Sequence, residues 1–468
     1  MENMIVYGVG GAIGKIIPFI LLPIITRMLP STYYYGLSDL VDVLVSFGAS
    51  FSVLGMYDIM FRMFFEKEDE KYKKIICSST MYFVLINAII LCSLLTVFSK
   101  HIAYYVFGNK QYFKLVIVAS CSIFFSAMSL IISAPTRMKN EKEKYLIINS
   151  IIPFFSYGFS MILLNFGYYE YALPLVTLCN YLLLTIIFLV INHTYFELKL
   201  RDWVLIKKML KLSIPLVPNF VIYWVFNSCD KLMINKIINT EAAGVYGVGA
   251  KLGHMSQLIY SAFAGGWQYF AFSTMKDDDQ VELTSKVFEY LGILTFLAGI
   301  IITIFSKAIF SILFTSDYAE GYIVMPYLFI APLLLMLFQT AGNQFLVIKK
   351  TWPTMFILFV GAIVNLGTNL GLIPVLGIEG AAIGTLLGYV VSVIICVCVL
   401  KRNKLLNIYS RFIKATFSTC IFYLVWRTFT NRIDIVYELV GGITICYLLI
   451  LYKRDIGVLY KKVIKERS

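Results

Sequence analysis

The sequence predicts an all-α, polytopic membrane protein with about 14 transmembrane helices. Apolar stretches recur between Ile5 and Tyr452, and each is near the roughly 20 residues that a helix needs to cross a bilayer. Hydrophobic residues make up 59% of the 468-residue chain and charged residues only 14%, a balance that a soluble fold could not bury. About 14 spans of this length would use most of the chain, so few residues are left for a soluble domain.

The basic residues predict the orientation of these spans. With the N-terminus inside, 29 of the lysines and arginines fall in cytoplasmic connectors or the C-terminal tail, and seven fall on the other side. Cytoplasmic loops carry such an excess of Lys and Arg. We therefore expect a multi-pass protein with both termini in the cytoplasm. The same bias explains most of the formal charge of +13, so no nucleic-acid partner is expected.

A weak internal repeat divides the chain. Ile25-Thr26-Arg27 followed by Gly36 matches Ile234-Asn235-Lys236 followed by Gly244, at a spacing of about 208 residues. Six spans in each half bring the second half into the membrane in the same direction as the first, which gives parallel repeats. The predicted parts are a six-helix bundle at 1–195, a cytoplasmic amphipathic linker at 196–213, a second six-helix bundle at 214–400, and helices 13 and 14 with a basic cytoplasmic tail at 401–468.

Several cations fall within or at the ends of predicted spans, where a charge is costly unless it faces protein, water or a ligand. We take them as candidates for holding an anionic substrate. A structural alternative exists for two of them, since Asp58 stands four residues before Arg62 and Asp230 adjoins Lys231. The candidate cations are Lys15, Arg27, Arg62, Lys231 and Lys251.

Four acidic residues in the spans are candidates for binding a coupling cation or proton. Asp39 and Asp42 share one face of span 2 at i, i+3, and an intramembrane carboxylate is a functional candidate by default. They are equally suited to be counter-ions of the cations in span 1. Asp58 and Asp230 have the same two interpretations.

Aromatic and amide side chains on spans 7 and 8 suit the faces and hydroxyl groups of sugars. Packing and anchoring at the membrane interface are the structural alternative for each of them. The candidates are Tyr223, Trp224, Asn227, Gln257 and Trp267, with Tyr260 and Gln268 beside them.

No catalytic signature is present, and we expect no enzyme, no cofactor and no metal site. Gly8, Gly10, Gly11 and Gly14 precede Lys15 in the manner of a phosphate loop, but Ile16 stands where that motif needs Ser or Thr. The three histidines lack the spacing of metal ligands.

Particular motifs resemble the polysaccharide (O-antigen) flippase family of the superfamily that includes multidrug and toxin extruders (MATE) and the peptidoglycan-precursor flippase. The motifs are Gly14-Lys15-Ile16-Ile17-Pro18 through Thr26-Arg27, Asp230-Lys231-Leu232-Met233-Ile234, Gly244-Val245-Tyr246 to Lys251-Leu252, Asn365 to Asn369, and Gly377-Ile378-Glu379-Gly380-Ala381-Ala382-Ile383-Gly384-Thr385. The resemblance covers about residues 1 to 400.

The resemblance implies two MATE-like bundles that rock between inward-open and outward-open states. It implies a flippase of the bacterial cytoplasmic (inner) membrane that moves an undecaprenyl-diphosphate-linked oligosaccharide from the inner to the outer leaflet, for O-antigen or capsule biosynthesis. Membrane lipids, a polysaccharide polymerase and chain-length machinery are the expected partners. The intramembrane cations agree, because a diphosphate headgroup is anionic.

Two other functions compete. A cation-coupled multidrug exporter of the same fold would hold cationic substrates with buried carboxylates, whereas the five candidate cations favour an anionic substrate. A membrane polymerase or ligase of lipid-linked oligosaccharides would carry a large extracytoplasmic loop, and the longest such connector, about Ser99 to Gln111, is small.

Overall fold

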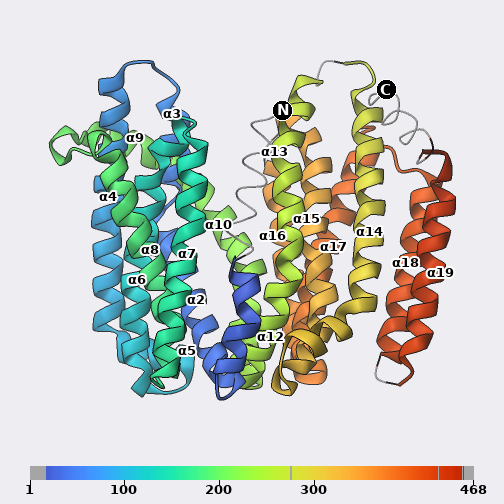
Figure 1. Cartoon of the computed structure of the whole chain (residues 1–468). Coiled ribbons are helices and arrows are strands. Elements are labelled where there is room, and N and C mark those ends of the chain that lie inside the picture. The colour runs from blue at the N-terminus through green and yellow to red at the C-terminus, as the bar shows by residue number, and fades with distance from the viewer. Residues whose placement is uncertain (1–16, 275–276, 351, 431, 456, 458–468) are drawn as a thin grey trace. The chain divides into compact units, whose positions relative to one another are not determined.

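The computed structural model describes residues 17–274, 277–350, 352–430, 432–455 and 457, and every regular element in them is helical (Figure 1). A short helix at Ile17–Met28 comes first. The first half continues with α2 Thr32–Val53, α3 Met56–Phe64, α4 Glu70–Val97, α5 Ser99–Phe107, α6 Phe113–Met138, α7 Lys142–Asn165, α8 Tyr169–Asn192 and α9 Trp203–Ser213. The second half holds α10 Val217–Trp224, α11 Asp230–Ile237, α12 Thr240–Gly253, α13 Gln257–Ser273, α14 Gln280–Leu313, α15 Val324–Val347, α16 Trp352–Leu376, α17 Ile378–Arg402, α18 Ser410–Phe429 and α19 Asp434–Leu451.

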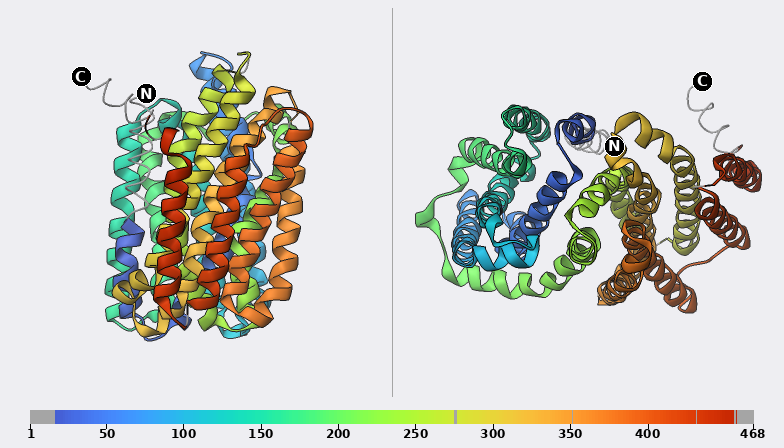
Figure 2. Two further views of the ribbon diagram at one scale, coloured as in Figure 1. Left: turned by 90° about the vertical axis from the view of Figure 1, so that its right-hand side faces the viewer. Right: turned by 90° about the horizontal axis from the view of Figure 1, so that it is seen from below.

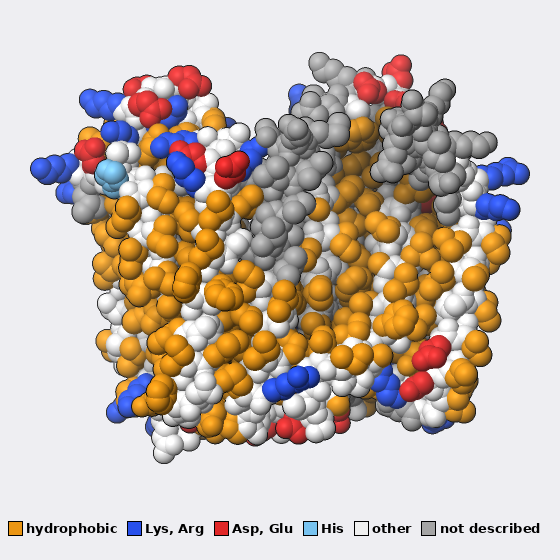
Figure 3. All heavy atoms as spheres, viewed as in Figure 1, with side chains coloured by type: hydrophobic (Ala, Val, Ile, Leu, Met, Phe, Trp, Pro, Cys, Tyr) orange, Lys and Arg blue, Asp and Glu red, His pale blue; other side chains and the backbone are white. Residues whose placement is uncertain are grey.

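Eleven helical segments among the described residues are long and apolar enough to cross a membrane. The prediction of a polytopic all-α protein is therefore confirmed. The other three expected spans fall on the short helix Ile17–Met28, on α12 and α13, which a 3₁₀ turn at His254–Ser256 separates, and on α18, which carries three basic residues. Figure 3 shows hydrophobic side chains along the helices and charged ones gathered at their ends, as the bilayer requires.

The chain forms two compact units. Unit 1 comprises Met1–Lys251, Leu313–Gly321 and Ala362–Thr385, and unit 2 comprises Leu252–Ile312, Tyr322–Gly361 and Leu386–Ser468. These units cut across the two halves that the repeat suggests, because unit 1 takes in parts of both. The division into bundles at 1–195 and 214–400 stays a prediction.

Unit 1 packs around α6, which contacts α2, α4 and α8. Two apolar clusters fill it. One includes Leu37, Leu40 and Ile123, and the other includes Met60, Ile131 and Met209. Span 2 breaks between these clusters, since Leu54 and Gly55 both have positive φ and separate α2 from α3.

In unit 2, α18 and α19 lie side by side, as the red helices of Figure 2 show. A charged cluster anchors them to α14. The guanidinium of Arg411 on α18 donates to both carboxylate oxygens of Glu289 on α14, at 2.7 and 2.8 Å, and also to Asp455. Tyr452 donates to Glu289 at 2.6 Å. Such fork geometry fixes orientation, so the two helices outside the repeat are tied to the second half of the chain.

Candidate functional site

The connectors of unit 1 separate into two ends, and one of them carries the basic residues. Lys139, which follows α6, lies over the ring of Tyr195 at 4.3 Å, and Lys74 on α4 lies 3.9 Å from the carboxylate of Glu197. These contacts gather the α3–α4, α6–α7 and α8–α9 connectors at one end, which we call the basic end (top of unit 1 in Figure 1).

The connectors at the opposite end of unit 1 are held by aromatic contacts. The hydroxyls of Tyr33 on α2 and Tyr112 before α6 are 2.6 Å apart, and Asn235 on α11 donates to the carbonyl of Val106 at 2.7 Å. This second contact joins the first and second halves of the chain. The two halves therefore meet at the opposite end within unit 1.

A buried ion pair reinforces this junction. Lys231 on α11 lies 3.0 Å from the carboxylate of Asp39 on α2, and their side chains are 16% and 2% exposed. A charge buried in protein needs a partner, and each of these two residues supplies it for the other. Sequence analysis selected both residues but did not predict that they pair.

The backbones of helices α2 and α12 are in close contact at two glycines. A Cβ atom on Gly36 would overlap the carbonyl oxygen of Thr240, and one on Gly244 would overlap the carbonyl oxygen of Thr32. The built Cβ of Gly36 would also lie 3.1 Å from the amide nitrogen of Gly244. No other residue allows this backbone approach. Gly36 and Gly244 occupy equivalent positions in the internal repeat. Each helix therefore has a glycine, with no side chain, at the point of contact.

Lys251, at the end of unit 1 on α12, faces a small cavity. The cavity has a volume of about 30 Å³ and is also lined by Ser38, Asp42 and Tyr157, which is room for a water molecule. The Nζ atom lies 5.2 Å from the ring centroid of Tyr35. Among the described residues no carboxylate lies within ion-pair distance of Lys251, and Asp42 accepts a hydrogen bond from Thr177 at 3.0 Å. The ammonium group of Lys251 therefore lies inside unit 1, between a small cavity and the ring of Tyr35.

Asp230 lies in a second buried cluster, built from α11, α12, α16 and α17. Its carboxylate, 3% exposed, accepts hydrogen bonds from Tyr246 and Asn369, each at 2.6 Å, and from Thr385. Asn365 donates to Thr385 at 2.9 Å. No lysine or arginine among the residues described pairs with Asp230. A buried carboxylate without a paired cation is a candidate for binding a proton or a small hard cation.

A π-helical segment at Val225–Cys229 precedes this carboxylate, and such segments are frequent at functional sites. Successive helical residues point about 100° apart. Asp230 therefore faces the cluster of α12, α16 and α17, while Lys231 faces Asp39 on α2. One helix serves both polar sites.

The other charged candidates lie elsewhere. Lys15 is outside the described residues. Arg27 donates to the carbonyl of Leu313 at 3.3 Å. Arg62 has a side chain that is 72% exposed and lies 4.0 Å from Glu66 rather than from Asp58.

The aromatic and amide candidates divide between the units. In unit 1, Trp224 donates to the carbonyl of Val43 at 3.4 Å and packs on Phe47, and Asn227 donates to the carbonyl of Tyr223. In unit 2, Trp267 is buried and stacks on Phe263, and Gln257 is half-buried. Their contacts are those of packing residues, and a role in sugar binding stays a prediction.

Sequence reasoning did not assign roles to the partners of Asp230, which are Tyr246, Asn365, Asn369 and Thr385. They lie within motifs that carry the family resemblance, but their residue types alone indicate nothing. Only the fold brings three distant segments onto one carboxylate.

Comparison with known proteins identifies a family for the chain and similar solved structures for its fold. Residues 24–322 match the model of a family described as polysaccharide biosynthesis protein. No curated protein sequence matches the chain. Among solved structures, the lipid II flippase MurJ in an inward closed conformation is similar with a TM-score of 0.73 at 15% identity, over 97% of this chain and 100% of that one.

Two structures of MATE transporters are also similar. An inward-facing multidrug resistance MATE family transporter gives a TM-score of 0.64 at 12% identity, over 86% of this chain and 94% of that one. A MATE protein in a straight conformation gives a TM-score of 0.53 at 12% identity, over 86% of this chain and 96% of that one. The fold is that of MurJ and the MATE transporters, and the chain belongs to the polysaccharide biosynthesis protein family.

Proposed function

We propose that this protein is a flippase for an undecaprenyl-diphosphate-linked oligosaccharide, which it moves from the inner to the outer leaflet of the bacterial cytoplasmic membrane by alternating access. The product serves O-antigen or capsule biosynthesis, and the protein itself performs no covalent chemistry. The family and the fold support a lipid-linked transporter. The basic end of unit 1 is cytoplasmic in this proposal, because basic connectors favour that side.

The observation that carries the proposal is Lys251. A lysine in a membrane interior is costly unless it faces protein, water or a ligand, and Lys251 lines a cavity without a carboxylate in ion-pair contact among the described residues. A diphosphate would give this cation the direct ion-pair contact that Asp42, on the same cavity, does not make. The cavity must widen to admit it, and opening of the junction at Gly36 and Gly244 provides that change.

Replacing Lys251 by alanine is expected to reduce flipping at least tenfold with little change in the amount of protein. A tenfold change corresponds to about 1.4 kcal/mol, less than a charge-assisted hydrogen bond of about 1.5–3 kcal/mol contributes. Lys251→Arg should retain part of the rate, because it keeps the charge.

The measurement is translocation of a fluorescent undecaprenyl-diphosphate saccharide in proteoliposomes, together with surface polysaccharide in cells. Lys100→Ala, which removes an exposed lysine near Phe113, is the control and should leave both unchanged. Full-rate flipping by Lys251→Ala would show that Lys251 does not hold the substrate.

We further propose that the Asp230 cluster binds the coupling cation or proton. Asp39 is then the counter-ion of Lys231, and Asp42 and Asp58 remain secondary candidates for coupling. Support comes from the buried carboxylate of Asp230, which has no cation paired with it among the described residues and which accepts hydrogen bonds from Tyr246, Asn369 and Thr385.

Asp230→Asn is expected to abolish the dependence of flipping on an ion gradient. The amide keeps the size and most hydrogen bonds of the carboxylate but not its charge, so the fold should be retained. Flipping is measured with imposed sodium and proton gradients, one at a time. Asp317→Asn, at an exposed position, is the control. An unchanged ion dependence in Asp230→Asn would make the cluster purely structural.

A further inference from the structure

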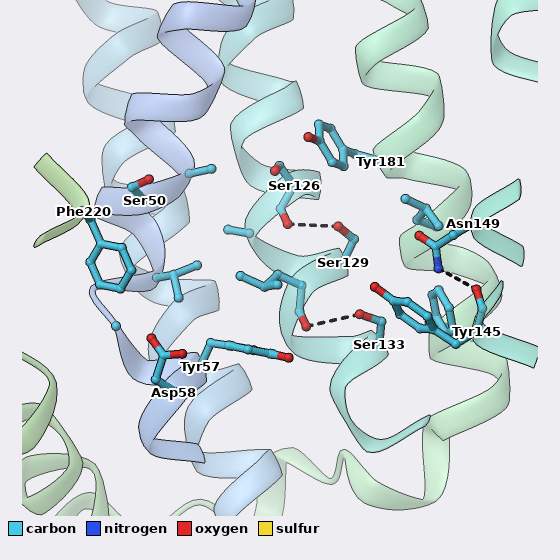
Figure 4. Close-up of a pocket in the computed structure, with 17 residues that line it drawn as sticks. Ser50, Tyr57, Asp58, Ser126, Ser129, Ser133, Tyr145, Asn149, Tyr181 and Phe220 are labelled. Atoms are coloured by element: carbon cyan, nitrogen blue, oxygen red, sulfur yellow. Dashed lines mark hydrogen bonds between the residues drawn. The ribbon is translucent and has the colours of Figure 1, made fainter. Parts of the chain in front are cut away.

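A second cavity in unit 1 lies between α2, α3, α6, α7 and α8 and has a volume of about 400 Å³ (Figure 4). This is within the roughly 300–1,000 Å³ of small-molecule pockets. It is separate from the Lys251 cavity, although both use span 2. Ser38 and Asp42 line the Lys251 cavity, whereas Ser50 and Asp58 line this one.

The polar groups of this pocket are mainly hydrogen-bond acceptors. Ser129 and Ser133 donate their hydroxyl protons to carbonyls of their own helix, at 2.9 and 3.3 Å, so their oxygen lone pairs remain for a ligand. Asn149 donates one of its two amide N–H groups to the carbonyl of Tyr145 at 2.8 Å, so its oxygen and its second N–H remain for a ligand. The pocket therefore favours a ligand rich in donors, such as hydroxyl groups.

The charge of the lining favours an uncharged ligand over an anion. Asp58 is the charged residue among the described residues that line the pocket, and the nearby Arg137 donates to Tyr57 and forms no ion pair with Asp58. A carboxylate accepts hydrogen bonds from neighbouring hydroxyls and repels another carboxylate.

Aromatic faces complete the pocket. Tyr57 and Tyr145 stand at its lower part in Figure 4, and Phe220 closes one side. Arg137 fixes both tyrosines, since it donates to the Tyr57 hydroxyl at 2.6 Å and lies 5.4 Å from the Tyr145 ring centroid. Because Tyr57 accepts this bond, its own proton is available to a ligand. Rigid rings suit the apolar C–H face of a pyranose.

We propose that this pocket is a saccharide subsite that binds one uncharged sugar ring of the substrate. The proposal rests on the proposed function and deepens it, because it assigns sugar selection to the first half of the chain rather than to the aromatic residues of spans 7 and 8. Its lining matches a sugar in both respects, with acceptors for the hydroxyls and rings for the apolar face.

The test is protection of a cysteine from N-ethylmaleimide. Ser126→Cys, in the pocket, is placed in the full-length chain after replacement of its nine native cysteines. Glucose, N-acetylglucosamine and rhamnose are the neutral probes, glucuronate is the anionic probe, and Ser311→Cys at an exposed position on α14 is the control. At least one neutral sugar should slow labelling of Ser126→Cys severalfold, while glucuronate should not, and labelling of Ser311→Cys should be unaffected by the neutral sugars.

Asp58→Asn gives a second arm, since loss of the carboxylate should allow glucuronate to protect Ser126→Cys. The chain with its native cysteines gives a third, because a bound neutral sugar raises its melting temperature. Protection by none of the neutral sugars, or by glucuronate equally well before Asp58 is changed, would overturn the proposal. Flipping by the unaltered chain is measured separately, so failure of this subsite and failure of the proposed function give different results.

Discussion

Gly244→Leu is expected to prevent closure of the opposite end of unit 1 and to stop flipping. A side chain at this position would overlap the carbonyl of Thr32 on α2, and overpacking of a tight contact costs about 1–3 kcal/mol. That cost lowers the equilibrium constant for closing by roughly 5- to 150-fold. Alternating access fails if one state is lost.

Two readouts check this prediction. Flipping in proteoliposomes should fall by a similar factor, and Ser38→Cys, which is buried in this conformation, should react faster with a membrane-impermeant maleimide added from outside. Gly367→Leu is the matched control, because Gly367 is exposed on α16 and a Cβ there meets nothing within 4 Å. Normal flipping by Gly244→Leu would mean that this contact takes no part in the cycle.

Asp39→Asn and Lys231→Met are each expected to destabilise the protein strongly, and the double variant is expected to recover most of the loss. Removing one partner of a buried pair leaves an uncompensated charge, at a cost of about 3–5 kcal/mol. The double variant leaves no charge behind. The melting temperatures of the four proteins form a double-mutant cycle that isolates the pairwise term.

The exposed pair of Lys307 and Asp434, whose side chains are 45% and 38% exposed, is the control. The corresponding cycle on this pair should give an interaction of about 0–1 kcal/mol. Additive effects of Asp39→Asn and Lys231→Met would show that the two charges do not stabilise each other.

The sequence predicted the fold class because length and hydropathy alone decide whether a segment can cross a bilayer. It also selected Asp39, Asp42, Lys231 and Lys251, because a charge in a membrane-spanning segment is costly unless it faces protein, water or a ligand. It could not predict their partners. Asp39 and Asp42 share a helix face, yet one pairs with Lys231 and the other accepts from Thr177, since partner choice depends on the packing of distant helices.

The pocket lined by Ser126, Ser129 and Ser133 was also not predicted from the sequence, but for a different reason. Its serines lie within α6 and hydrogen-bond their own helix, as serines in apolar helices commonly do. Nothing in their spacing distinguishes a pocket wall from ordinary packing. The partners of Asp230 were not predicted either. A single asparagine or threonine in a helix does not indicate a site, and its role becomes clear only once the fold places it beside the carboxylate.

The most direct measurement is flipping by the purified protein alone. Proteoliposomes are loaded with a fluorescent undecaprenyl-diphosphate saccharide in both leaflets, and a membrane-impermeant quencher is added outside. With the protein present, the inner-leaflet fraction should become accessible at a rate that depends on the amount of protein and that falls in Lys251→Ala. If the inner-leaflet fraction stays protected in vesicles that hold the folded protein under every ion gradient tested, the protein is not a flippase for lipid-diphosphate-linked saccharides.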